Sequence, residues 1–153
     1  MKTFAEYQLL TKQAEALTAD ENDLTANLAN ISALLNMNLD QINWVGFYLL
    51  KQKQLVLGPF QGKVACVRIP LEKGVCGSAF SSNSILRIAD VHQFAGHIAC
   101  DAQSLSEIVL PINVNGVTVA VLDIDSPIRD RFSETDQQGL AHFIENIQEK
   151  LGF

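Results

Sequence analysis

Long apolar runs are missing from this sequence: no stretch approaches the roughly 18–20 residues needed to cross a bilayer. The first residues hold an acidic side chain, Glu6, and no apolar stretch of the signal-peptide type. Linkers, internal repeats and low-complexity tracts are absent as well. We therefore expect one domain over residues 1–153, with no membrane partner and a cytoplasmic location.

Clustered positive charge is also scarce. The 153 residues include 11 Lys and Arg against 17 Asp and Glu, a formal net charge of −6. Binding a phosphate backbone needs a cationic face, so we expect no nucleic-acid partner. An acidic protein can still hold a small substrate that carries an ammonium group. With 48% hydrophobic and 18% charged residues, the composition is that of a globular protein.

Cysteine is limited to three residues, Cys66, Cys76 and Cys100, which cannot all pair within one chain. In a reducing cytosol they are poor candidates for a structural disulfide framework. Their spacings of ten and twenty-four residues match no pattern of close cysteine pairs that binds zinc. His92, His97 and Cys100 form an H-x4-H-x2-C cluster without a fourth ligand of suitable spacing. We expect neither a bound metal nor another cofactor.

The hydrophobic period changes along the chain. Residues 3–36 place apolar side chains at helical spacing, which predicts two helices. Residues 42–126 alternate as strands do, and residues 133–150 return to the helical period behind a capping sequence that begins at Ser133. Strands are expected at 42–50, 54–60, 64–69, 85–89, 108–114 and 117–125. The sum is an α+β domain, a mostly antiparallel sheet of about six strands with helices packed on it.

Acidic side chains gather at one end of the expected final hairpin. Asp123 and Asp125 are two residues apart on one strand, so both project from the same face. Glu107 lies at the far end of the partner strand and reaches them if the strands pair suitably. Three converging carboxylates repel one another unless a cation or a shared proton lies between them, although a solvated strand end is the simpler interpretation. Trp44 and Tyr48 could supply an aromatic wall for such a site.

The register of this hairpin decides whether Glu107 belongs to the acidic site. A two-residue turn at Asn115-Gly116 pairs Glu107 with Ile124, which places the glutamate on the wrong face. A three-residue loop instead pairs Glu107 with Asp123. A shared acidic site therefore predicts the longer loop or a compensating bulge near Pro111.

Each cysteine also has a purely structural interpretation, because a free cysteine is most often a small buried hydrophobe. Cys66 falls within an expected strand and shares its face with Arg68. Cys76 is flanked by Val75 and Gly77 in a turn of small residues that is expected to open a short helix. The three cysteines together carry more information than any one of them.

The loop of residues 90–104 is longer than most connections, and such loops commonly form lids or binding walls. Cys100 lies in it among polar neighbours, where exposure and reactivity are more plausible than burial. His92 and His97 belong to the same loop, and we favour loop-anchoring hydrogen bonds over a catalytic role for both.

Several motifs lie in one order along the whole chain, and this order is specific. They are Gly58-Pro59-Phe60-Gln61-Gly62-Lys63, Ala65-Cys66-Val67-Arg68-Ile69, Lys73-Gly74-Val75-Cys76-Gly77, Asp90-Val91-His92, Gly96-His97-Ile98-Ala99-Cys100-Asp101, Ser106-Glu107-Ile108-Val109 and Val121-Leu122-Asp123-Ile124-Asp125-Ser126-Pro127. With these motifs the sequence resembles the GAF-domain free methionine-(R)-sulfoxide reductases.

The resemblance implies a GAF fold and reduction of the free R sulfoxide of methionine, with recycling by thioredoxin. It makes Cys100 the attacking thiol, and Cys66 and Cys76 the resolving partners, with their order left open. Attack would leave a sulfenic acid that a second thiol converts to a disulfide. At pH 7 an unperturbed thiol is only a few per cent thiolate, and the neighbouring Asp101 opposes its ionisation.

The resemblance also implies the substrate contacts. Glu107, Asp123 and Asp125 correspond to the substrate-binding acids, and Trp44 and Tyr48 lie near the methyl end of the substrate. The main alternative is a non-catalytic GAF module that senses a small ligand, since GAF folds host both functions. A dimerising scaffold with inert thiols would leave the acidic cluster unexplained. Exposed N-terminal helices make a homodimer a possible assembly.

Overall fold

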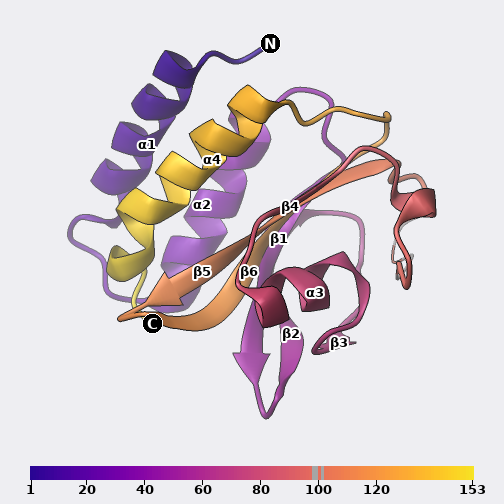
Figure 1. Ribbon diagram of the computed structural model, residues 1–153. Coiled ribbons are helices and arrows are strands. Elements are labelled where there is room, and N and C mark those ends of the chain that lie inside the picture. The colour runs from indigo at the N-terminus through magenta and orange to yellow at the C-terminus, as the bar shows by residue number, and fades with distance from the viewer. Residues whose placement is uncertain (98–99, 101) are drawn as a thin grey trace.

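The computed structural model describes residues 1–97, 100 and 102–153. At its centre is one antiparallel sheet with the strand order β3-β2-β1-β6-β5-β4 (Figure 1). The strands are β1 (Trp44–Lys51), β2 (Gln54–Gly62), β3 (Arg68–Pro70), β4 (Leu86–Ile88), β5 (Ser106–Val114) and β6 (Val117–Ser126). The helices are α1 (Phe4–Thr18), α2 (Leu24–Asn38), α3 (Gly74–Ser82) and α4 (Glu134–Ile147), with 3-10 turns at Val91–Gln93 and Gln148–Lys150. None of the helices in the described part has the length and apolar character needed to span a membrane.

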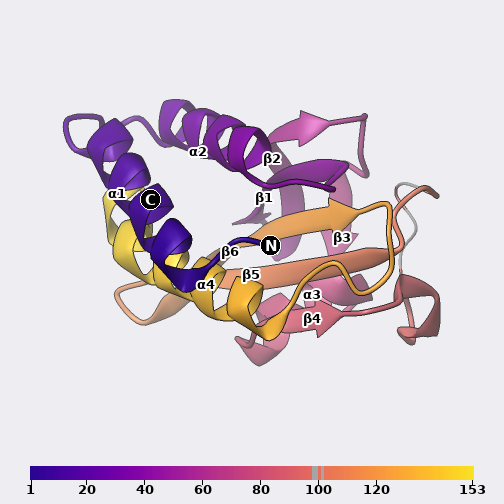
Figure 2. The same cartoon turned by 90° about the horizontal axis from the view of Figure 1, so that it is seen from above.

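The two faces of the sheet carry different layers. Helices α1, α2 and α4 cover one face, and the short helix α3 lies on the other (Figure 1; Figure 2). On β6, Leu122 and Ile124 are buried in the core beneath the three long helices, whereas Val121 is buried on the α3 side. Because alternate residues of a strand share a face, Asp123 and Asp125 emerge on the α3 side. The expected α+β fold is confirmed.

The hairpin of β5 and β6 combines a tight turn with a bulge. Val114 pairs with Val117 across a two-residue turn, so the three-residue loop was wrong. The register then shifts by one residue at Ile112 and Asn113, next to Pro111, which is the alternative that the shared acidic site predicted. Beyond the bulge Glu107 pairs with Asp125, and the two side chains therefore project on the same face.

The segment before β3 does not form the strand expected at 64–69, because β3 begins only at Arg68. Two carbonyl groups of this segment accept hydrogen bonds from aromatic side chains instead of from a neighbouring strand. The Trp44 indole donates to the Lys63 carbonyl at 3.1 Å, and the Tyr48 hydroxyl donates to the Cys66 carbonyl at 2.8 Å. Cys66 is therefore held in a loop over the sheet rather than in mid-strand.

A buried carboxylate joins the two ends of the chain. Asp136 accepts hydrogen bonds from the Tyr7 hydroxyl on α1, from the Ser133 backbone N–H at 2.8 Å and from Nη1 of Arg131 at 3.0 Å. The Tyr7 ring packs so closely on Gly139 that a side chain there would collide with it. Burial acts to raise the pKa of Asp136, but the Tyr7 hydroxyl, the Ser133 amide and Arg131 hold it below its usual range.

We expect Asp136→Asn to lower the free energy of unfolding by about 3–5 kcal/mol, because it removes the buried carboxylate and leaves the half-buried Arg131 without its partner. Because the pKa of Asp136 is lower in the folded protein than in the unfolded chain, its ionised carboxylate stabilises the fold. This contribution is complete above the ordinary carboxyl pKa near 4, and it is lost as the pH falls through the pKa of the folded state. Urea denaturation at neutral and at acidic pH measures both effects. Asp130→Asn, an exposed neighbour, is the control, and equal midpoints for the two variants would contradict the prediction.

Candidate active site

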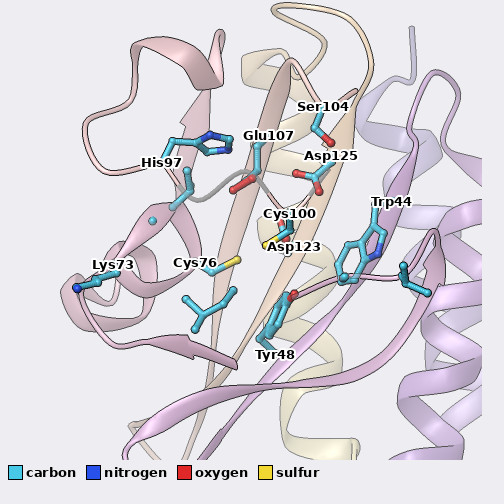
Figure 3. Close-up of a pocket in the computed structure, with 15 residues that line it drawn as sticks. Trp44, Tyr48, Lys73, Cys76, His97, Cys100, Ser104, Glu107, Asp123 and Asp125 are labelled. Atoms are coloured by element: carbon cyan, nitrogen blue, oxygen red, sulfur yellow. The ribbon is translucent and has the colours of Figure 1, made fainter. Parts of the chain in front are cut away.

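A pocket lies between the α3 side of the sheet, the start of α3 and the loops that cross them (Figure 3). It is lined by Trp44, Tyr48, Val64, Ala65, Ile69, Lys73, Gly74, Val75, Cys76, His97, Cys100, Ser104, Glu107, Asp123 and Asp125. Seven of the eight side chains that the sequence suggested for a site are among these residues. The eighth, Cys66, is bonded to Cys100.

Three carboxyl groups converge in this pocket from two adjacent strands. Glu107 comes from β5, and Asp123 and Asp125 come from β6. Glu107 and Asp123 are only 7% and 6% exposed. Burial, followed by the charges of Asp123 and Asp125, raises the pKa of Glu107 well above its ordinary value. Burial, followed by Asp125, does the same for Asp123, so the group favours a bound proton or a cation.

An aromatic wall faces the acids from β1. Trp44 stacks on Tyr48 with ring centroids 5.9 Å apart and on Phe60 at 5.1 Å. Gly46 lies between the two β1 aromatics along the strand, directly opposite Asp123 on β6. Any side chain at Gly46 would collide with Phe60 and the Trp44 ring, so the close packing of this wall requires glycine. The wall offers an apolar surface beside charged groups.

A disulfide joins Cys66 to Cys100, which are 34 residues apart, with a Cα–Cα distance of 5.5 Å. The bond links the loop before β3 to the long loop between β4 and β5. Cys100 also lines the pocket, so the bond places a redox-active sulfur beside the acids and the aromatic wall. The sequence left the pairing partner of Cys100 open between Cys66 and Cys76.

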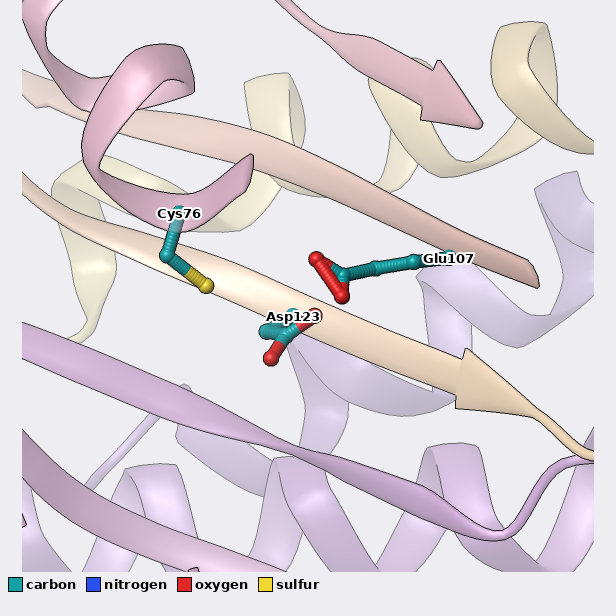
Figure 4. Close-up of side chains that lie close together, drawn as sticks. All are labelled: Cys76, Glu107 and Asp123. Carbon is teal, nitrogen blue, oxygen red and sulfur yellow. The ribbon is translucent and has the colours of Figure 1, made fainter. Parts of the chain in front are cut away.

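Cys76 is the free thiol of the described chain and lies buried at the start of α3. Figure 4 shows its sulfur pointing toward the carboxyl groups of Glu107 and Asp123. Burial, followed by the negative charges of Asp123 and Glu107, raises the pKa of the Cys76 thiol well above its ordinary value. A thiol that resists ionisation is a poor nucleophile.

The two loop histidines occupy different environments. His92 is exposed, and its Nδ1 lies 3.2 Å from Oδ1 of Asp90, as expected for a loop anchor. His97 lines the pocket, where Figure 3 places its ring next to Glu107. Burial, followed by the nearby His92, lowers the pKa of His97 and favours its neutral form. Asp101, the acidic neighbour of Cys100 in sequence, lies outside the described residues together with residues 98 and 99.

Two features of the pocket were not predicted from the sequence. One is Ser104, which accepts a 3.1 Å hydrogen bond from the Asn43 amide and lies near Asp125 (Figure 3). The other is the N-terminus of α3, where Gly74, Val75 and Cys76 line the pocket and the N-cap residue Lys73 makes no side-chain cap. The first backbone N–H groups of a helix have no partner within it and attract anions. The run of small residues around Cys76 predicted that a helix starts here, but it did not predict that the start of the helix faces the pocket.

Comparison with known proteins gives consistent matches over almost the whole chain. The sequence pattern of the GAF domain family matches residues 23–148. The chain is 54% identical over 145 residues to the free methionine-R-sulfoxide reductase of Escherichia coli strain K12, covering 95% of this chain and 88% of that protein. It matches the structure of fRMsr of Staphylococcus aureus in its reduced form with a TM-score of 0.93 and 57% identity, over 98% of this chain and 96% of that chain. An X-ray structure of free methionine-R-sulfoxide reductase from Neisseria meningitidis in complex with its substrate matches with a TM-score of 0.92 and 42% identity, over 97% and 89%.

Proposed function

Because the chain belongs to the GAF-domain family and, within it, to the free methionine-R-sulfoxide reductases, we propose that it reduces the free R sulfoxide of methionine to methionine. The observation that carries this proposal is the position of the disulfide. Its Cys100 half lines the pocket that also holds three carboxyl groups, two of them buried, and an aromatic wall. A thiol, a proton source and an apolar surface are the groups that sulfoxide reduction needs.

In the first step the Cys100 thiolate attacks the electrophilic sulfur of the sulfoxide. The sulfoxide oxygen must be protonated as its bond to sulfur breaks. A protonated carboxyl group among Glu107, Asp123 and Asp125 donates this proton, since burial and mutual repulsion favour the neutral acid there. The new S–S bond joins Cys100 to the substrate sulfur as a sulfonium, and the oxygen leaves as water after it takes up a second proton. Water then attacks the Cys100 sulfur, breaks the S–S bond and returns one proton, so the products are methionine and a sulfenic acid on Cys100 and two oxidising equivalents pass to the protein.

In the second step the Cys66 thiol attacks the sulfenic sulfur of Cys100, forming the disulfide and releasing water. The Cα–Cα distance of 5.5 Å between the two residues supports this pairing, because a disulfide needs a separation of about 4.4–6.8 Å. Cys76, the other candidate, is buried and has a raised pKa, which disfavours it as the resolving thiol. A dithiol protein of the thioredoxin type then reduces the disulfide and restores both thiols.

The same pocket can hold the charged ends of a free amino acid. The acids of β5 and β6 bind its α-ammonium group, and the N-terminal amides of α3 receive its carboxylate. Trp44 and Tyr48 pack against the S-methyl group, because their stacked rings form the apolar side of the pocket. Both charged ends of the substrate would then have partners within one pocket.

Counting thiols tests the proposal. The fully reduced chain has three thiols, and we expect excess free methionine (R)-sulfoxide, without added reductant, to remove two of them per molecule while one methionine forms. Thiol titration and chromatography measure the two quantities on the same sample. Free methionine serves as the control ligand. A non-catalytic sensor would lose no thiols, and that outcome would reject the enzyme.

A further inference from the structure

The proposed reaction makes no use of the free thiol of Cys76, although it lies among the acids of the pocket. Its Sγ, a carboxylate oxygen of Glu107 and one of Asp123 all lie within 4.8 Å of one another. They come from α3, β5 and β6, and the three residues are 5%, 7% and 6% exposed. Figure 4 shows the three side chains directed toward a common point. We propose that this triad binds a thiophilic divalent cation, of which zinc is the best match.

A second observation points to a ligand at the same place. Oδ1 of Asp123 is buried and has no hydrogen-bond partner among the described residues. An unpartnered buried carboxylate oxygen is costly, and such a group in a native protein calls for a proton, a water molecule or an ion. Asp123 also lines the pocket, so an ion that enters there reaches its carboxyl group.

The donor set selects the kind of metal. Zinc accepts both thiolate and carboxylate ligands, with Zn–S near 2.3 Å and Zn–O near 2.0–2.2 Å. Magnesium and calcium prefer oxygen ligands alone and a larger number of them, so the sulfur of Cys76 disfavours both. Three protein ligands leave the fourth tetrahedral position of zinc to water. The cluster is not visible in the sequence, because its members are 31 and 16 residues apart, and the sequence led us to expect no metal.

Zinc at this position would occupy the acids that the proposed function assigns to the substrate. The cation would replace the α-ammonium group and remove the proton that the sulfoxide oxygen needs. The structure therefore assigns zinc the role of a reversible inhibitor that competes with substrate, a statement that rests on the proposed function. The metal site itself does not depend on that function.

The oxidised protein is the right material for the test, because its disulfide leaves Cys76 as the single thiol. Titration with Co²⁺ should give a thiolate-to-metal absorption band with one ion per chain, and calorimetry should give one Zn²⁺ site. Cys76→Ser should abolish the band and weaken Zn²⁺ binding by at least about tenfold, as the loss of a direct ligand should. Asp123→Asn should weaken binding similarly but keep Cys76 in place, and Mg²⁺ should not bind.

Glu145→Gln on the exposed side of α4 is the matched control and should leave Zn²⁺ affinity unchanged. No band in the wild type, or a Zn²⁺ affinity in Cys76→Ser and Asp123→Asn equal to that of the wild type, would overturn the site. Competition then tests the inhibitory role: methionine (R)-sulfoxide should raise the apparent Kd of Zn²⁺ in proportion to its concentration. If both ligands bind without affecting each other, competition is rejected. If methionine sulfoxide fails to bind the reduced, zinc-free Cys100→Ser protein, which cannot turn it over, the proposed function is rejected while the metal site stands.

Discussion

Replacing Cys100 by serine is expected to abolish methionine formation, lowering kcat by on the order of a thousandfold or more. A serine hydroxyl is far less acidic and less nucleophilic than a thiol, so no attack on the sulfoxide sulfur takes place. The variant should also keep all of its remaining thiols when it is mixed with substrate. We assign the attacking thiol to Cys100 because this residue lines the pocket and forms one half of the disulfide.

Cys66→Ser should behave differently, because the sulfenic acid on Cys100 still forms but has no thiol to resolve it. One methionine per chain should appear in a burst, after which turnover with a thioredoxin-type reductant stops. Cys76→Ser is the comparison, and it should continue beyond one turnover. Rapid-quench chromatography of methionine per chain measures all three variants. A single burst from Cys76→Ser with sustained turnover by Cys66→Ser would make Cys76 the resolving thiol. A burst from Cys100→Ser would reject the assigned nucleophile.

Blocking the α-amino group of the substrate is expected to reduce kcat/KM by a few hundred-fold or more. Glu107 and Asp123 are buried, and burial raises the pKa of both carboxyl groups, so their charged forms need a cation. The α-ammonium group is the only cation that free methionine sulfoxide offers. N-acetylation replaces it with a neutral amide and leaves charges unpaired, at a cost on the order of 3–5 kcal/mol.

The measurement compares kcat/KM for free and N-acetyl methionine (R)-sulfoxide in the wild type and in Asp125→Asn. The variant should lose much more activity on the free substrate than on the acetylated one, because only the free substrate uses the carboxylate. Glu145→Gln, a change in surface charge on α4, should leave the ratio of the two substrates unchanged. Equal rates on both substrates in the wild type would reject the ammonium site and return the acids to a structural role.

Local patterns in the sequence determined the helices, most of the strands and the shared face of two of the three acids in the site. The change from helical to strand period placed the helices and most strands, and the capping sequence at Ser133 placed the start of α4. The two-residue spacing of Asp123 and Asp125 put both carboxyl groups on one face, and the structure has them there. These features depend only on residues that are close along the chain.

Tertiary structure alone decided which distant groups meet. The bulge beside Pro111 shifts the pairing of β5 with β6 and so brings Glu107 to the face of the acids. The strand expected at 64–69 is reduced to β3, which begins at Arg68, and the Cys66 carbonyl before it accepts its hydrogen bond from the distant Tyr48 side chain. The pairing of Cys66 with Cys100 needs two loops 34 residues apart to lie within disulfide distance. No local pattern encodes such distances, since they result from the packing of the whole sheet.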